Sequence, residues 1–354
     1  MESTGSMVMA QMRQRARLSL LALALSLGLM GCGAVSETGS TVSQDNVGAS
    51  QGSGEAAEET ISAYPDFSQS SVEWQGKHYR RNTYVKPILL LGIDNAGSMQ
   101  GKKEYGYAGQ CDAVFLLAHD TARNTVKLLL IPRDTMTEVL EENPDTGIVE
   151  PYTDHLSLSY CFGDGREESC ENTRHSVQRL LMNLEINDYM AIDTTVISGL
   201  NDAVDGVTVT IPTEGMEQTD PAFVYGETIT LHGAQAERFV RYRDCTVDNS
   251  ALNRSQQHRQ YIAGFFQALK LKSAKDSGII TKLYDQMQDY MITNMQKETY
   301  LKAALDVLQQ GTIDDSSMLT LPGYGTATDT YDEYYAETDS IPEILLDMFY
   351  REAQ

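Results

Sequence analysis

The chain has 354 residues, of which 41% are hydrophobic, enough to bury one large core or two modest ones. Acidic residues outnumber basic residues by 50 to 27, giving a formal net charge of -23. This charge would repel a polyanion at long range, so nucleic acid is excluded as an expected partner. In so acidic a protein, any local group of arginines needs an explanation other than general solubility.

The N-terminal segment has the features of an export signal. Arginines precede the apolar run from Leu18 to Met30, which is too short to cross a bilayer as a helix. The run ends in a sequence similar to a bacterial lipobox, in which Cys32 would be lipidated. We therefore expect residues 1–32 to be a lipoprotein signal peptide that leaves the protein anchored to the outer face of the cytoplasmic membrane. An uncleaved signal anchor is the alternative.

The next segment predicts a tether and a small element that enters the folded part. No lysine or arginine occurs between Cys32 and Lys77, and the small and acidic residues there predict a flexible acidic linker over residues 33–70. Alternating residues around Gln75 and Gly76 predict a small hairpin within residues 71–86.

Residues 87–354 have the pattern of an α/β domain with C-terminal packing helices. Apolar runs typical of strands occur at residues 87–93, 113–118, 125–131, 189–193, 207–211 and 318–321. Apolar residues at helical spacing occur within residues 177–184, 262–269, 279–291 and 341–350.

An oxidising exterior would permit disulfides among the remaining cysteines. Cys161 and Cys170 lie in one polar loop, so they would form the easiest local bridge. A bridge between Cys111 and Cys245 would join two segments rich in charged residues. Buried free thiols are the alternative to both bridges.

Two carboxylates flank the first two strands of the predicted sheet. Asp94 leaves the carboxyl end of one strand, and Asp112 begins the next. If these strands are antiparallel neighbours, the two side chains converge, and together with water and substrate phosphates they would suit Mg²⁺. The loop from Gly97 to Gln110 is long for such a pair, although a loop can absorb the insertion. Separate capping roles for the two aspartates are the alternative.

Arginines follow two other apolar elements. Pro132 ends the third strand, and Arg133 and Asp134 come directly after it. A second group consists of Arg238, Arg241, Arg243, Arg254 and Arg259. Guanidinium groups bind phosphate oxygens in pairs of hydrogen bonds, so this group predicts a diphosphate ligand. Salt bridges to structural carboxylates are the alternative.

Taken in chain order, these segments resemble the successive motifs of the LytR-CpsA-Psr family. The matching segments are Leu90–Asp94, Asp112, Ile131–Thr135, Tyr160–Gly163, Asp188–Tyr189, Ile192–Asp193, Asp205–Val207, Leu231–Gly233 and Val240–Arg243. The ordered set is specific although each motif alone is weak. The resemblance implies a three-layer α/β/α sandwich with a mixed central sheet, carrying a groove for a polyprenyl chain.

The resemblance also implies an activity and its partners. Such proteins are phosphotransferases that move a glycopolymer phosphate from a polyprenyl pyrophosphate-linked carrier, such as a teichoic acid precursor, to peptidoglycan, using Mg²⁺. A polyprenyl-phosphate-binding lipoprotein with a regulatory or scaffold role is one alternative. A polyprenyl pyrophosphate hydrolase is another.

The family's site residues carry over to matching positions of this chain. Asp94 and Asp112 would hold the metal. The pyrophosphate would be bound by Arg133, Arg241, Arg243 and Arg254. Asp134 would orient Arg133 or act as a base, which makes Arg133, Asp134, Arg241 and Arg243 the expected catalytic residues.

One family motif is altered in this chain. The usual Asp-x-Gly-Arg-x-x-Arg-Gln stretch corresponds to Ala251–His258, so an acidic residue is absent at Ala251 and an arginine is absent at Gln257. Asp248 and Arg259 are candidate substitutes. Arg259 is the weaker one, because two positions beyond Gln257 on a helix it points about 160° away.

Overall fold

The computed structural model describes residues 63–95, 97–123, 125–143, 146–244, 250–309, 313, 315–328 and 331–353. The expected signal peptide, the lipidation at Cys32 and most of the predicted linker lie outside these residues, as do Cys245 and Asp248. Among the helices that are described, none is both long and apolar enough to cross a membrane.

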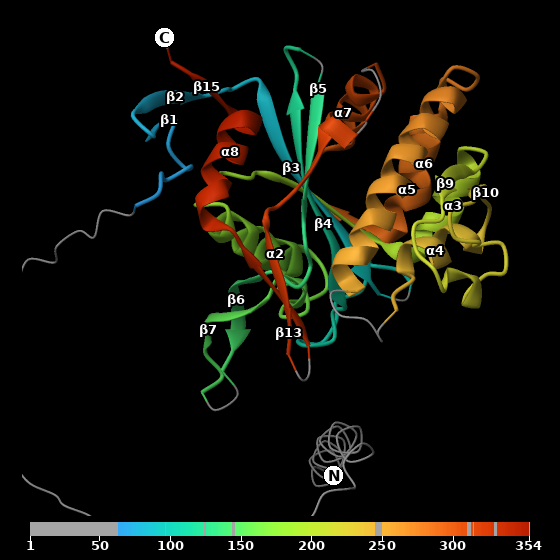
Figure 1. The fold of residues 1–354 in the computed structure, drawn as a ribbon, viewed down its shortest axis with the longest axis horizontal. Helices are drawn as coiled ribbons and strands as arrows, with labels where there is room; N and C mark the ends of the chain where they lie inside the picture. The colour runs from blue at the N-terminus through green and yellow to red at the C-terminus, as the bar shows by residue number, and fades with distance from the viewer. Residues whose placement is uncertain are drawn as a thin grey trace, which may run out of the picture. The chain divides into compact units, whose positions relative to one another are not determined.

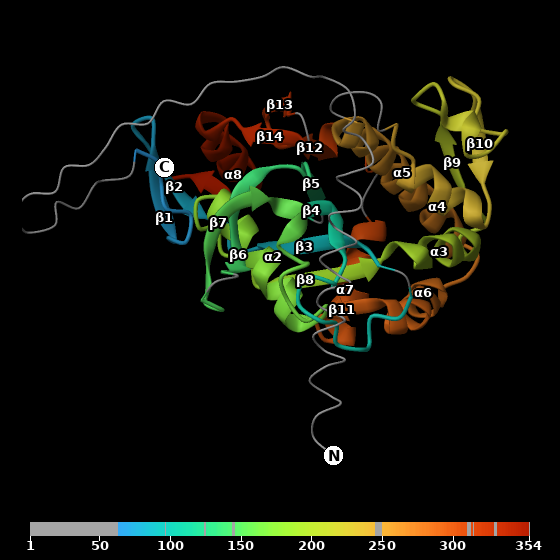
Figure 2. The same ribbon diagram turned by 90° about the horizontal axis from the view of Figure 1, so that it is seen from below.

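A six-stranded mixed sheet forms the centre of the domain (Figures 1 and 2). Its strand order is β11-β8-β3-β4-β5-β12, where β3, β4 and β5 form an antiparallel meander, and β8 and β12 run parallel to β3 and β5. The strands are β3 (Val85–Asp94), β4 (Gln110–Asp120), β5 (Thr125–Ile131), β8 (Asp188–Asp193), β11 (Met291–Thr293) and β12 (Met318–Thr320). Five of these six strands coincide with apolar runs in the sequence.

Helices cover both faces of this sheet. One face packs against α2 (Glu167–Leu180) and α8 (Ile341–Phe349). The other face meets a larger set, which comprises α3 (Ile197–Ala203), α4 (Ala234–Arg241), α5 (Ser250–Ser273), α6 (Ile279–Met287) and α7 (Lys297–Gln309). Figure 2 shows α2 and α5 on opposite sides of the strands. The expected three-layer α/β/α sandwich with a mixed central sheet is confirmed.

Four small sheets surround this core. The predicted hairpin is present as β1 (Ser71–Trp74) and β2 (Lys77–Arg81), to which the last strand, β15 (Tyr350–Glu352), adds. The other three are two-stranded ribbons: β6 (Met136–Glu142) with β7 (Val149–His155), β9 (Val207–Thr210) with β10 (Thr228–Leu231), and β13 (Gly323–Ala327) with β14 (Asp332–Ala336). Two of these ribbons, β6–β7 and β13–β14, were not expected from the sequence.

The structure corrects two helix boundaries. The helix expected to reach Leu184 ends at Leu180, because Met182 and Asn183 adopt left-handed backbone conformations with φ of 52° and 63°. The helical pattern expected to continue to Met291 ends with α6, and Met291 instead begins β11. In both places apolar spacing persists into a turn or strand that faces the same core.

The predicted linker was also too long. It was expected to extend to residue 70, yet Phe67 is only 1% exposed and its backbone N–H donates to the Met182 carbonyl at 2.9 Å. The folded domain therefore includes residues before β1.

The two faces of the central sheet are buried to different extents. On the α2 and α8 side, which we call the packed face, Leu89 and Ile93 are both 0% exposed. On the side of α3 to α7, several apolar side chains keep part of their surface in contact with solvent. These residues, which we call the half-buried face, are Leu90, Ala113, Leu117, Met190 and Ile192.

Candidate functional site

The two predicted metal carboxylates lie at one end of the sheet and on one face. Asp94 stands opposite Gln110 across the antiparallel pair of β3 and β4. The register then shifts, because Ile93 pairs with Cys111 while Gly92 pairs with Ala113, which leaves Asp112 as the extra residue of a β-bulge. Cys111 points into the packed face, so Asp94, Gln110 and Asp112 face the other side.

The long loop between these strands packs against the domain. Met99 is 0% exposed, and its backbone N–H donates to the Asp289 carbonyl at 2.8 Å. Gly109 has a φ of 89°, and a Cβ atom there would lie 2.8 Å from the Asp94 carbonyl oxygen. Glycine at this position therefore lets the loop close directly against the end of β3.

Arg133 is held by side chains from several segments at this end of the sheet. Its guanidinium donates to Asp112, to Gln110 Oε1 at 2.5 Å and to Ser157 Oγ at 3.0 Å. Its Nε donates to Asp134 Oδ1 at 3.1 Å, which is the geometry of an orienting residue. Pro132 ends β5 immediately before, so Arg133 emerges at the carboxyl end of the strand.

Arg254 reaches the same carboxylate from α5. Its Nη1 donates to Asp112 Oδ2 at 3.0 Å, and its side chain is 8% exposed. Burial lowers the pKa of Arg254, and the positive charges of Arg133 and Arg243 lower it further, whereas Asp112 raises it. Its Nη2 is buried and has no hydrogen-bond partner among the described residues. A buried guanidinium nitrogen in this state lacks an acceptor that a bound anion would supply.

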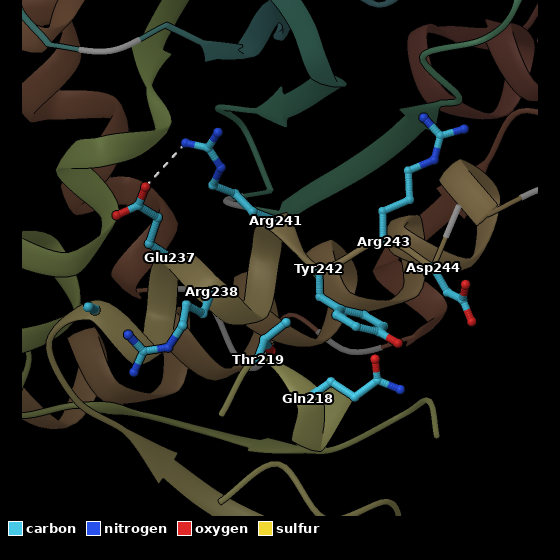
Figure 3. A pocket seen from close by; sticks show the side chains of 9 residues that line it. Gln218, Thr219, Glu237, Arg238, Arg241, Tyr242, Arg243 and Asp244 are labelled. Atoms are coloured by element: carbon cyan, nitrogen blue, oxygen red, sulfur yellow. Dashed lines mark hydrogen bonds and ion pairs between the residues drawn. The ribbon is translucent and has the colours of Figure 1, made fainter. Parts of the chain in front are cut away.

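Arg241 and Arg243 approach from the end of α4. Arg241 pairs with Asp94 at 2.8 Å and with Glu237 at 3.2 Å, and Arg243 pairs with Asp332 of β14 at 3.3 Å. Tyr242, between them, has an extended backbone, so the two guanidinium groups point to one side and the tyrosine to the other (Figure 3). The structure therefore brings the four predicted pyrophosphate-binding arginines to the end of the sheet where Asp94 and Asp112 lie.

A cavity of about 770 Å³ adjoins the two arginines at the end of α4 (Figure 3). Its lining residues are Gln218, Thr219, Ala234, Glu237, Arg238, Arg241, Tyr242, Arg243 and Asp244. Arg238 pairs with Asp220 at 2.7 Å, which makes it a wall residue rather than a member of the Asp112 group.

The altered motif on α5 holds the backbone at the end of α4, which carries Arg241 and Arg243. With its amide nitrogen turned toward α4, Gln257 donates to the carbonyls of Tyr242 at 3.1 Å and Phe239 at 3.2 Å. His258 Nε2 lies 3.0 Å from the Val240 carbonyl. These contacts satisfy carbonyl groups that a helix end leaves without partners. Burial, followed by the charge of Arg254, lowers the pKa of His258 to about 4, so the ring is neutral at pH 7.

Arg259, the candidate substitute for the missing arginine, donates to Thr320 Oγ1 at 3.2 Å. Thr320 ends β12 and pairs with Leu130, so this contact lies at the same end of the sheet as Arg133. Gln257 is 2% exposed and occupies the position where the family motif has an arginine. In this chain the position therefore supports the backbone instead of supplying a charge.

Asp193 is a buried carboxylate that the sequence did not single out as a site residue. It lies opposite Ile93 in the parallel pair of β8 and β3, and its Oδ1 accepts from the Thr195 backbone N–H at 2.7 Å. Its Oδ2 is buried without a partner among the described residues. Burial, aided by the charge of Asp94, raises its pKa, while Thr195 and Arg241 oppose the change. Its position at the end of an apolar strand, like that of Asp94, was the signal that could have identified it.

Three other contacts were not foreseen. Gln110 and Ser157 bind Arg133, and Asp332 binds Arg243. Each of these partners lies on an element whose place beside the site depends on the tertiary fold, so the local sequence carried no signal for it.

The described cysteines form no disulfide. Cys111, Cys161 and Cys170 are free thiols, so the local bridge between Cys161 and Cys170 is absent. Burial raises the pKa of Cys111 and Cys170. These two cysteines therefore act as apolar core residues of the packed face.

Known proteins share both sequence and fold with this chain. Over 242 residues it is 26% identical to a polyisoprenyl-teichoic acid–peptidoglycan teichoic acid transferase, TagU of Bacillus cereus, covering 67% of this chain and 69% of that protein. TagV of Bacillus subtilis, which bears the same transferase name, is 24% identical over 294 residues, or 79% of this chain and 69% of the relative.

Solved structures agree on the fold. The crystal structure of B. subtilis TagV has a TM-score of 0.56 and 18% identity, covering 75% of this chain and 98% of that one. A structure of TagT bound to LI-WTA has a TM-score of 0.54 and 18% identity, with coverage of 75% and 90%. The sequence model of the LytR_cpsA_psr family matches residues 47–348, and this chain therefore belongs to that family.

Proposed function

We propose that this protein is a phosphotransferase that moves a glycopolymer phosphate from a polyprenyl pyrophosphate-linked carrier to a cell-wall acceptor, peptidoglycan. Family membership and the teichoic acid transferase names of the relatives support this class of reaction. Teichoic acid is accordingly the proposed type of cargo. Lipidation at Cys32 would hold the domain at the outer face of the cytoplasmic membrane, where such a carrier is exposed.

The observation that carries the proposal is the arrangement around Asp112. Arg133 and Arg254 bind its two oxygens from different elements, and the Arg254 Nη2 remains buried without an acceptor. Asp112 and Asp134 already balance the charges of Arg133 and Arg254, so the unsatisfied Nη2 is the feature that calls for a further acceptor. An oxygen of a diphosphate would supply that acceptor.

The half-buried face supplies a place for the polyprenyl chain. Leu90, Met190 and Ile192 lie on the face of the sheet to which Asp94 and Asp112 also point, and they remain partly exposed beneath α5 and α7. An amphipathic ligand could therefore place its diphosphate at the arginines and its hydrocarbon along this strip. Burial of each CH₂ group would contribute about 0.8 kcal/mol.

We propose a magnesium ion at the same end of the sheet. Asp94 and Asp112 are hard oxygen donors on one face, and each pairs with at least one guanidinium group. Among the described residues no group of three or more His, Cys, Asp or Glu side chains could hold a metal, so the ion would retain water and use phosphate oxygens. When bound, Mg²⁺ would neutralise charge on the diphosphate.

The proposed reaction is a displacement at phosphorus. An acceptor sugar hydroxyl attacks the phosphorus nearer the glycopolymer, and a new O–P bond forms as the bond from that phosphorus to the bridging oxygen breaks. Polyprenyl phosphate leaves as a monoester that takes up the hydroxyl proton. Arg133, Arg241, Arg243 and Arg254 would position the diphosphate and stabilise the charge that develops on its oxygens. Asp134 already accepts a hydrogen bond from Arg133 Nε, so its role here is to orient that guanidinium.

The test uses purified protein with Mg²⁺, a polyprenyl pyrophosphate-linked glycopolymer and a peptidoglycan acceptor. Arg133→Ala should lower the rate of transfer by about 10² to 10³-fold, as expected for loss of a donor that stabilises the transition state. Arg123→Ala, an exposed arginine at the turn between β4 and β5 at the opposite end of the sheet, is the matched control and should leave the rate unchanged. Equal activity of the two variants would refute the proposed site.

Product analysis separates the two competing functions. Release of free glycopolymer phosphate when both donor and acceptor are present would indicate a hydrolase that uses water. Binding of the carrier with no turnover under the same conditions would indicate a regulatory or scaffold lipoprotein. Covalent attachment of the glycopolymer to peptidoglycan supports the transferase.

A further inference from the structure

Two hairpins flank the arginines at the carboxyl end of β5. They are β6–β7 and β13–β14, and Figure 1 shows both projecting beyond the same end of the central sheet. Thr135 of the segment after Arg133 forms an isolated bridge with Tyr334 of β14, and the Tyr334 N–H donates to the Asp134 carbonyl at 2.8 Å. The second hairpin is therefore attached directly to the backbone that positions Arg133.

The outer side of β13–β14 presents a pair of stacked tyrosines. Tyr324 and Tyr335 stand opposite each other in the hairpin, with ring centroids 5.7 Å apart and an angle of 23° between the rings. They are 63% and 38% exposed, whereas Tyr334, the residue before Tyr335, points inward, is 6% exposed and donates to the Leu321 carbonyl. The inner tyrosine anchors the hairpin, and the outer pair contributes aromatic surface to solvent.

A third exposed tyrosine precedes β14 of the same hairpin. Tyr331 is 66% exposed and meets His155 of β7 edge-on at 5.9 Å. The same His155 lies 2.9 Å from the Asp332 carbonyl, and the Asp332 carboxylate pairs with Arg243. We call Tyr324, Tyr331 and Tyr335 the tyrosine surface. Through Tyr331, the hairpin that carries this surface is joined to Arg243 by a chain of direct contacts.

The charge around the tyrosine surface selects among ligands. Residues 134–165 and 303–350, which include both hairpins, contain no lysine or arginine but many acidic residues. A polymer of phosphodiesters would be repelled there. A tyrosine ring has an apolar face and a polar tip, so an uncharged ligand with alternating C–H and hydroxyl groups fits this surface well.

We propose that the tyrosine surface binds the uncharged glycan backbone of the peptidoglycan acceptor, stacking sugar rings on Tyr324 and Tyr335 and directing a hydroxyl toward the arginines. This inference rests on the proposed transferase function for its biological role. The predicted binding itself does not depend on turnover. The acidic surroundings favour the acceptor glycan over the anionic glycopolymer at this location.

The test measures cosedimentation of the full-length protein with peptidoglycan sacculi that have been stripped of teichoic acid. The double variant Tyr324→Ala/Tyr335→Ala should bind the sacculi about tenfold more weakly, a loss of about 1.4 kcal/mol, since tyrosines are enriched among the residues that dominate an interface. Tyr84→Ala and Tyr225→Ala are matched controls, because each tyrosine is 56% exposed and lies outside both hairpins. Both controls should bind like the unmodified protein.

Further measurements separate this proposal from failure of the fold or of the proposed function. Tyr324→Phe/Tyr335→Phe keeps the rings and should retain most of the binding. Binding of polyprenyl pyrophosphate should be unchanged in all tyrosine variants, and in the transfer assay the alanine pair should raise the KM for acceptor more than it lowers kcat. If the alanine pair binds sacculi as tightly as the controls, the proposal is wrong. If Arg133→Ala abolishes transfer but the variant still binds sacculi, the proposal that the tyrosine surface binds the glycan still stands.

Discussion

The two faces of the central sheet are closed in different ways. The packed face is filled by apolar side chains of α2 and α8, and Leu89, Leu116 and Leu129 there are 0% exposed. The half-buried face is covered by α5, whose N-terminal part is held by polar contacts of Arg254, Gln257 and His258. The same apolar strands therefore bury one face of the sheet completely, which stabilises the fold, and leave apolar side chains of the other face partly exposed.

The packed face therefore contributes mainly to the stability of the fold, and the half-buried face mainly to the proposed ligand binding. Apolar packing on one face is insensitive to pH and salt, whereas the polar contacts that hold α5 and the end of α4 depend on charge and protonation. The half-buried face should therefore tolerate substitution better and respond more strongly to solution conditions.

The largest effect is expected from adjacent leucines of β3 that point to opposite faces. Leu89→Ala should lower the free energy of unfolding by about 2–5 kcal/mol, because it leaves a cavity in a fully packed core. Leu90→Ala should cost about 1 kcal/mol, since its side chain is already partly exposed. Urea denaturation measures both. Equal losses would show that the faces do not differ in packing.

A pH-dependent effect of intermediate size is expected from His258. Its pKa is lowered from 6.5 to about 4 in the folded protein, so the unfolded chain binds a proton more readily. Its contribution to stability is complete above pH 6.5 and decreases as pH falls from 6.5 to 4. The decrease should reach at most about 3 kcal/mol. Part of the residue remains solvent-accessible, so that figure is an upper limit.

His258→Gln provides the comparison for this prediction. Its amide nitrogen can replace Nε2 as the donor to the Val240 carbonyl and does not titrate. Thermal unfolding at pH 7 and pH 5 should show a smaller loss for His258→Gln than for the unmodified protein. The same pH dependence in both proteins would contradict the assignment to His258.

The smallest effect concerns lipid binding on the half-buried face. Met190→Gln keeps a similar side-chain volume but adds a polar amide, and should weaken binding of a polyprenyl phosphate by about tenfold. Met136→Gln, on β6 and outside this face, is the matched control. Calorimetric titration with the lipid measures the effect, and inorganic pyrophosphate should bind all three proteins alike. A loss for Met136→Gln equal to that for Met190→Gln would exclude the half-buried face as the lipid site.

The sequence alone determined the family, the α/β class and five of the six strands of the central sheet, because apolar runs and ordered motifs are local properties of the chain. It also indicated Asp94, Asp112 and the arginines, since each follows or precedes a buried element. It did not determine the partners Gln110, Ser157 and Asp332, or the role of Gln257 in holding the end of α4.

Only the tertiary structure decided these points, for a physical reason that the β13–β14 hairpin illustrates. Its tyrosines carry no periodic signal that distinguishes an exposed stacked pair from core residues. Their position beside Arg133 depends on a backbone contact between Asp134 and Tyr334, which are 200 positions apart in the chain. The unequal burial of the two sheet faces likewise follows from which helices cover each face. Contacts between distant segments depend on how the layers assemble, and no local pattern records that assembly.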